Sequence, residues 1–210
     1  MSGAQVYLIR HGDTGEALKG RFVGRQDVSL GPSGQRQAAA LARRPDLKSS
    51  REAFCSPMLR VRETLSYSGL DLACQQDLDL REIDFGRWEG LSFAEISRDY
   101  PDEVDRWARL ERDFCFPEGE AYADFLQRIQ KAAERIARTA ASQTPPVAVF
   151  AHGGVIRALI CHWLGLPAKH YLLFEIEPAS VSTVRLFGDR GVLTCLNDRG
   201  HLQGDPSWAV

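Results

Sequence analysis

Cysteine is scarce in this sequence, and the few cysteines are scattered. The 210 residues contain five, an odd number with no Cys-x-x-Cys spacing: Cys55, Cys74, Cys115, Cys161 and Cys195. This pattern argues against a disulfide framework and against a cysteine-based zinc site. We therefore expect reduced thiols, as in a cytoplasmic protein.

Long apolar runs and an excess of one charge are also missing. No stretch is apolar for long enough to cross a bilayer, and the first residues lack the basic and apolar segments of a secretory signal. The formal net charge is −2, which gives no reason to expect nucleic acid or a membrane as a partner. Any cationic site must therefore be local.

What remains is the composition of an ordinary globular protein. Hydrophobic residues make up 44% and charged residues 26% of a chain that shows no repeat, low-complexity tract or linker. We therefore predict a single domain over residues 1–210, large enough to bury a sizeable core.

Short apolar runs alternate with helical patterns along the chain. The segments predicted as strands are 6–9, 51–55, 78–84, 147–150, 181–187 and 192–196. The segments predicted as helices are 33–44, a short one from 92 that ends before Pro101, 122–141 and 155–164. The alternation predicts an α/β fold: a three-layer α/β/α sandwich with a mainly parallel central sheet, an antiparallel edge and a small helical cap over about 92–120.

Two predicted strands end in the same way. One runs into Arg10-His11-Gly12 and the other into Ala151-His152-Gly153. Ligands collect at the carboxyl ends of strands in open α/β sheets, so both imidazoles are expected in one pocket. A lone histidine at such a point is more often a partly buried ring bonded to the backbone, but two in the same context favour a function.

Arginines and carboxylates complete the candidate site. Arg10 offers a planar fork of donors to phosphate oxygens, and Arg60 follows a strand in the first turn of a predicted helix, where anions bind. Glu82, Asp84 and Glu89 lie among apolar and aromatic residues. Because desolvation favours a neutral carboxyl group, one of them suits proton donation, and the residues alone leave open which.

Taken in order, these segments resemble the histidine phosphatase superfamily, in its cofactor-dependent phosphoglycerate mutase-like branch. The matching segments are Arg10-His11-Gly12, 21–30, 34–38, 56–64, 80–90 and 151–154. The resemblance implies that His11 is a nucleophile that forms a phosphohistidine and that Glu82 donates the proton to the leaving alcohol. It also implies that two arginines and an imidazolium, those of Arg10, Arg60 and His152, hold the phosphoryl group.

The same resemblance extends to the wall of the pocket. It implies substrate contacts from Arg21, Val23, Gly24 and Phe85, and it implies neither a metal ion nor another cofactor. A small phosphorylated metabolite is the expected partner. The aromatic side chains of the cap would line the pocket, form the cap's own core or make a homodimer contact: Phe93, Trp107, Phe114 and Phe116.

We therefore expect a metal-independent phosphatase for small phosphomonoesters, with α-ribazole 5′-phosphate among the candidates. The tail over 196–202 is similar to the ending of broad-specificity and α-ribazole phosphatases, and the stretch between Glu82 and His152 is short for a mutase. Two alternatives stay open: a cofactor-dependent phosphoglycerate mutase and a non-catalytic phosphate-binding protein. A metal site at His152, Cys161, His162 and His170 is less favoured, because His162 and His170 lie among apolar and aromatic residues.

Overall fold

The computed structural model describes residues 3–109, 111, 113–142 and 145–203. Its centre is a six-stranded sheet with the order β3-β2-β4-β1-β5-β6. The strands are β1 (Ala4–Arg10), β2 (Glu52–Cys55), β3 (Ala73–Gln76), β4 (Val147–Ala151), β5 (Val181–Phe187) and β6 (Arg190–Asp198). The first four strands pair in parallel, whereas β5 is antiparallel to both β1 and β6.

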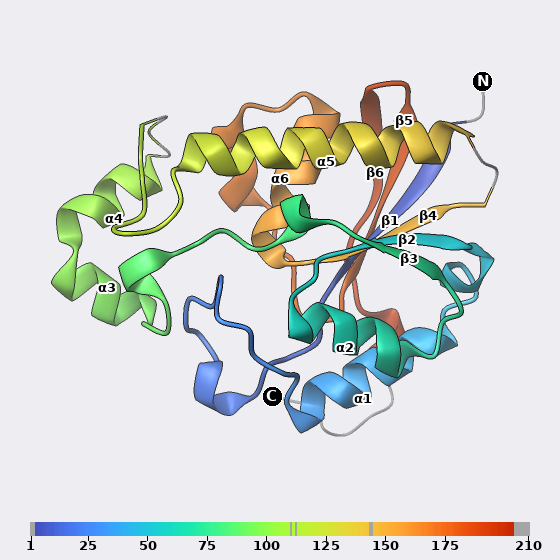
Figure 1. The fold of residues 1–210 in the computed structure, drawn as a ribbon, viewed down its shortest axis with the longest axis horizontal. Coiled ribbons are helices and arrows are strands. Elements are labelled where there is room, and N and C mark those ends of the chain that lie inside the picture. Colours follow the sequence, from blue (N-terminus) through green and yellow to red (C-terminus); the bar gives the residue numbers. More distant parts are fainter. Residues whose placement is uncertain (1–2, 110, 112, 143–144, 204–210) are drawn as a thin grey trace.

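Helices cover both faces of the sheet. In Figure 1, α5 (Tyr122–Ser142) and α6 (Gly153–Leu164) lie above it, and α1 (Pro32–Ala40) and α2 (Leu59–Ser68) lie below. Each face has its own cluster of buried apolar side chains, the larger one beneath α5 and α6. The predicted α/β/α sandwich with a mainly parallel sheet and an antiparallel edge is confirmed. Within the described ranges, no helix combines the length and apolar character that crossing a bilayer requires.

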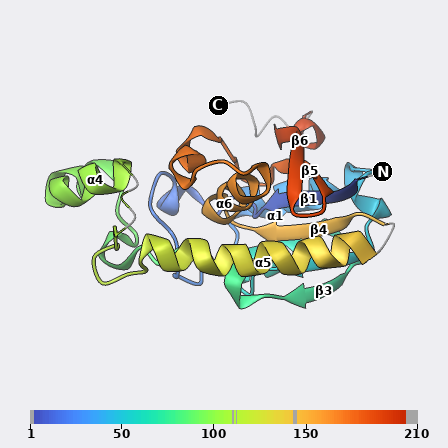
Figure 2. The ribbon, with the colours of Figure 1, turned by 90° about the horizontal axis from the view of Figure 1, so that it is seen from above.

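A pair of short helices forms the predicted helical cap. α3 (Phe93–Asp99) begins at a complete capping box between Ser92 and Glu95, and α4 (Pro101–Ala108) begins at a proline. Both helices lie beyond the N-terminal end of α5, away from the sheet (Figures 1 and 2). The predicted helix from Ser92 that ends before Pro101 is confirmed.

The strand predicted over 78–84 is wrong. Leu78–Leu80 forms a 3₁₀ turn, and the strand lies earlier, at Ala73–Gln76. All residues of β3 are exposed, and three of the four are not aliphatic, so no apolar run marks this edge strand. The apolar side chains of Leu80 and Ile83 are buried instead as anchors of an irregular segment.

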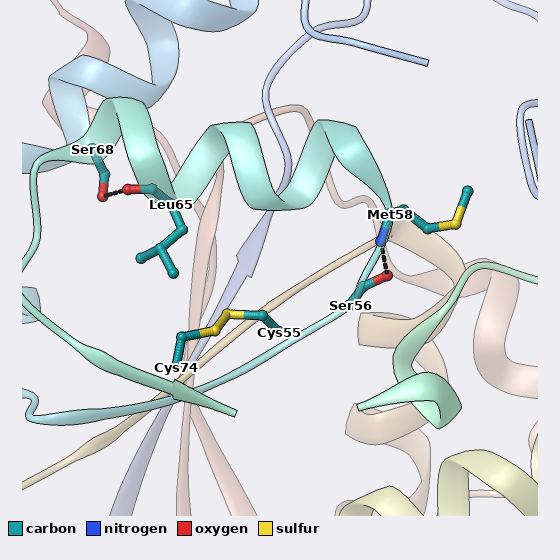
Figure 3. The surroundings of a disulfide bond; sticks show 6 residues. All are labelled: Cys55, Ser56, Met58, Leu65, Ser68 and Cys74. Atoms are coloured by element: carbon teal, nitrogen blue, oxygen red, sulfur yellow. Dashed lines mark hydrogen bonds between the residues drawn. A yellow bond between two sulfur atoms is a disulfide. The ribbon is translucent and has the colours of Figure 1, made fainter. Parts of the chain in front are cut away.

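The prediction of reduced thiols is wrong for one pair. Cys55, at the end of β2, and Cys74, in β3, form a disulfide with a Cα–Cα distance of 6.4 Å (Figure 3). The two strands are parallel neighbours in which Cys74 pairs with Ala53, so the cysteines are diagonal neighbours across the ladder. Because β3 itself was not predicted, this proximity could not be read from the spacing of the cysteines. Cys115, Cys161 and Cys195 are free.

Candidate active site

A cavity of about 500 Å³ lies where β1 and β4 end. Its wall includes Arg10 and His11 from the end of β1, Gly153 and Gly154 from the start of α6, and Glu82. β1 and β4 are hydrogen-bonded neighbours, and the backbone N–H of His11 donates to Ala151 at 3.0 Å. The two matching strand ends therefore meet, and the ring centroids of His11 and His152 are 5.2 Å apart.

The ring of His11 is fixed in one tautomer. Its Nδ1 lies 2.7 Å from the backbone oxygen of Gly12, which can only accept, so Nδ1 carries the hydrogen and Nε2 keeps its lone pair. Burial, and then the charges of Arg60 and Arg10, hold the pKa of His11 well below its ordinary value of 6.5. His11 is therefore a neutral imidazole with a nucleophilic Nε2 at neutral pH.

Arg10 places a cation with one unpartnered donor at the cavity. One of its terminal nitrogens donates to the backbone oxygen of Ile176, but its buried Nε has no partner among the described residues. Burial lowers the pKa of Arg10 to about 10, so the guanidinium stays charged at neutral pH. A buried cationic donor without a partner is a position where an anion would bind.

Arg60 and His152 are not among the residues that line the described cavity, and both side chains are fully buried. Arg60 donates to the backbone oxygens of Gln26 and Gly24, at 2.8 Å each, and its Nε donates to Nδ1 of His152 at 3.2 Å. Arg60 thus joins the loop after β1 to the second histidine.

The hydrogen bonds of His152 are those of a neutral ring, whereas the resemblance implied an imidazolium. Because Nδ1 accepts from Arg60, the ring hydrogen lies on Nε2, which donates to Ser56 Oγ at 2.8 Å. Burial, followed by the charge of Arg60, holds the pKa of His152 well below 6.5. The sequence alone shows neither the burial of this ring nor the arginine bonded to it.

The structure separates the three candidate carboxylates. Glu82 is buried on the cavity wall, with Oε2 2.9 Å from the N–H of Gly154. Asp84 accepts from the N–H of Gly86, and Glu89 accepts from three N–H groups, those of Gly24, Arg25 and Phe85. Asp84 and Glu89 are thus bound within the protein, and neither lines the described cavity.

Gly154 must be glycine for Glu82 to occupy this position. A Cβ at residue 154 would lie 2.4 Å from Oε1 of Glu82. The backbone N–H of Gly154 can therefore approach the carboxylate closely, at the positive end of the helix.

Three of the four predicted wall residues line the cavity. Arg21, Val23 and Phe85 do so, whereas Gly24 is packed behind the wall, where a Cβ would lie 2.0 Å from the backbone oxygen of Ile83. Arg21 is held by the backbone oxygen of Gly90 at 2.7 Å.

The aromatic residues of the cap divide into two groups. Trp107 lines the cavity and meets Phe22 edge to face, at 5.8 Å between centroids. Phe114 and Phe116 are buried in the core against Trp88, and Phe93 is half exposed beside Trp107. Only Trp107 of the four is therefore available to a ligand in the described cavity.

Arg157 and Tyr171 are among the wall residues that were not predicted. Arg157, on α6, donates to the backbone oxygen of Phe174 at 2.7 Å and lies over the ring of Tyr171, which also lines the cavity. Arg157 is a lone arginine on an apolar helix, and this pattern could have indicated a functional role. No sequence pattern indicates a role for Tyr171. Among the residues that the structure describes, no group of three or more His, Cys, Asp or Glu is placed to hold a metal ion.

The buried histidines predict an acid-sensitive fold. Burial lowers the pKa of His201 to about 4, and those of His11 and His152 lie well below 6.5. Between these values and 6.5 the unfolded chain binds more protons than the folded one, so stability is lost as the pH falls below 6.5. We expect the free energy of unfolding to fall by up to about 1.4 kcal/mol per pH unit for each histidine.

Urea unfolding at pH 7, 6 and 5 measures this dependence. Carboxylates contribute to it as well, so the wild type is compared with His201→Asn, whose slope over this range should be shallower. Identical slopes for the two proteins would contradict the assignment of His201.

Known proteins of one family are similar to this chain in sequence and in structure. The sequence model of the histidine phosphatase superfamily (branch 1) matches residues 6–199. Phosphoserine phosphatase 1 of Hydrogenobacter thermophilus is 28% identical over 204 residues, which cover 94% of each chain. The α-ribazole phosphatase of Shigella flexneri has a TM-score of 0.80 at 25% identity and covers 93% of this chain and 96% of its own.

A third similar protein comes from mycobacteria. Mycobacterial glucosyl-3-phosphoglycerate phosphatase, in a structure with VO3, has a TM-score of 0.80 at 27% identity and covers 92% of this chain and 98% of its own. These three proteins are named for three different phosphomonoesters, so similarity alone does not select a substrate.

Proposed function

The chain belongs to the histidine phosphatase superfamily (branch 1) and is a phosphatase of that family, and from this premise we propose that it hydrolyses small phosphomonoesters without a metal ion, through a phosphohistidine on His11. One observation carries the proposal. The neutral His11, its Nδ1 bound to Gly12, lines one cavity together with the guanidinium of Arg10, whose Nε has no partner among the described residues.

Two steps complete the proposed reaction. In the first, Nε2 of His11 attacks phosphorus, the bond to the ester oxygen breaks, and Glu82 gives its proton to the leaving alcohol. In the second, water attacks the phosphohistidine, Glu82 takes a proton from that water, and phosphate leaves. His11 returns to its neutral form.

Charge on the transferring phosphoryl group would be stabilised by arginine. Arg10 lines the cavity and is charged, and Arg60, which donates to His152, adds a second cation whose charge acts on His11. Phosphoryl transfer needs mainly in-line positioning and electrostatic stabilisation, which such groups supply. We also propose that Arg60 and His152 contact the phosphoryl oxygens directly.

The substrate would be a small metabolite with a bulky leaving group. The cavity of about 500 Å³ has an aromatic wall that includes Phe22, Phe85 and Trp107. α-Ribazole 5′-phosphate and phosphoserine are the first compounds to test, because two relatives carry those names.

A phosphomonoester panel tests the proposal. The purified protein should hydrolyse p-nitrophenyl phosphate and rank the metabolites by kcat/KM, with activity retained in a chelator and inhibited by vanadate. Loss of activity in the chelator would contradict the metal-independent mechanism. Isomerisation of phosphoglycerate that depends on a bisphosphate and outpaces hydrolysis would show the mutase alternative, and phosphate binding without turnover would show a non-catalytic protein.

A further inference from the structure

The segment that carries Glu82 has little regular structure of its own. Between β3 and α3, Leu78–Leu80 and Gly86–Trp88 form single 3₁₀ turns, and Glu82 lies in the irregular stretch between them. A carboxyl group that must meet a leaving oxygen needs a fixed backbone, because a displacement of about 1 Å costs about 10²-fold in rate. Something outside the segment must therefore hold it.

Two arginines of α5 hold this segment from one side. Arg128 and Arg135 are seven residues, or about two helical turns, apart, so they project from the same face of the helix. Arg135 binds the carboxylates of Asp77 and Asp79, at 2.8 and 2.6 Å, where the segment begins. Arg128 lies toward the end that carries Glu82.

Arg128 binds the backbone around Glu82 directly. One terminal nitrogen donates to the backbone oxygens of Asp79 and Arg81, at 2.7 and 2.6 Å, and the other donates to that of Glu82 at 3.1 Å. The side chain is 11% exposed, so water does not readily replace these bonds. A planar guanidinium can span several acceptors at once, which a lysine ammonium cannot do with the same geometry.

Glu120 holds the backbone on the other side of Glu82, and we call the Arg128–Glu120 pair the clamp. Its carboxylate accepts from Nε of Arg128 at 2.6 Å and from the backbone N–H of Asp84 at 3.2 Å. The charge of Arg128 is thereby paired, and Arg25 approaches the same carboxylate at 3.7 Å. The Arg128–Glu120 pair thus holds the backbone both before and after Glu82.

We propose that Arg128 is a positioning residue that fixes the main chain of Glu82 so that its carboxyl group meets the leaving oxygen. The inference rests on the proposed function, in which Glu82 donates that proton. Arg128 does not line the described cavity, so it acts through Glu82 and not on the substrate. Loosening the clamp should weaken proton transfer more than substrate binding.

The role of Arg128 is tested by comparing the turnover of substrates whose leaving groups do and do not need a proton. In Arg128→Met we expect kcat for an alkyl phosphate such as phosphoserine to fall by about 10²-fold, with KM changed far less. Hydrolysis of p-nitrophenyl phosphate should fall much less, because nitrophenolate leaves without a proton. Arg128→Lys should lie between wild type and Arg128→Met, and it supplies the measurement if the methionine variant does not fold.

Arg135→Met is the matched control. It removes an arginine of the same helix face that binds the same segment but reaches no atom of Glu82, so the ratio of alkyl to aryl turnover should stay that of the wild type. An equal loss for both substrates in the Arg128 variants would overturn the inference, as would the selective loss in Arg135→Met. Failure of the wild type to hydrolyse either substrate would instead refute the proposed function.

Discussion

Asparagine in place of His11 is expected to abolish turnover, with kcat lowered on the order of 10⁶-fold, the scale seen when a nucleophile is removed from a hydrolase. The imidazole Nε2 is the atom on which the proposed covalent intermediate forms, and His11 is the one histidine among the described residues that line the cavity. Asparagine keeps a donor for the backbone oxygen of Gly12, so the local fold should persist.

Trapping the intermediate checks this result directly. Acid-sensitive, base-stable phosphoryl label should appear on the wild type after rapid quenching and should be missing from His11→Asn. His162→Asn, on α6 and away from the described cavity, is the matched control and should label like the wild type. Label or turnover that survives in His11→Asn would reject the phosphohistidine.

The layers of the fold could be predicted because buried strands carry an apolar pattern. β1 and β4 each contain an unbroken apolar run, β5 has mostly buried residues, and all three strands lie where predicted. β3 could not be found, because an exposed edge strand of four residues has no pattern of its own and depends on pairing with β2. The disulfide between Cys55 and Cys74 was missed for the same reason.

Some features of the site could be predicted from the sequence and others could not. The repeated strand-to-histidine pattern placed His11 and His152 together, because parallel neighbours end at the same edge of a sheet. The charge of His152 could not be predicted, since it depends on Arg60 and Ser56, which lie far from it in sequence. The protonation of His152 therefore depends on tertiary contacts, whereas the proximity of His11 and His152 follows from the strand pattern.

The choice among three carboxylates also needed tertiary contacts. Glu82, Asp84 and Glu89 lie within eight residues of each other in similar surroundings. Only the packing of α6 and of the loop after β1 assigns Glu82 to the cavity and Glu89 to backbone N–H groups. Spacing along the chain cannot make that distinction.

Glutamine at position 82 should slow the hydrolysis of alkyl phosphomonoesters by about 10²- to 10⁴-fold, the contribution typical of a general acid. Glutamine keeps the size and an acceptor for the N–H of Gly154 but cannot donate a carboxyl proton. Turnover of p-nitrophenyl phosphate should fall far less, because its leaving group needs no proton. Steady-state kcat on a series of aryl and alkyl phosphates measures the difference as a steeper dependence on the leaving group.

The neighbouring carboxylates supply the controls for Glu82→Gln. Asp84→Asn keeps an acceptor for the N–H of Gly86 and should leave the leaving-group dependence unchanged. Glu89→Gln weakens the hold on the loop whose carbonyls receive Arg60, so it should slow aryl and alkyl substrates alike. If either control shows the selective loss and Glu82→Gln does not, the proton donor is that other carboxylate.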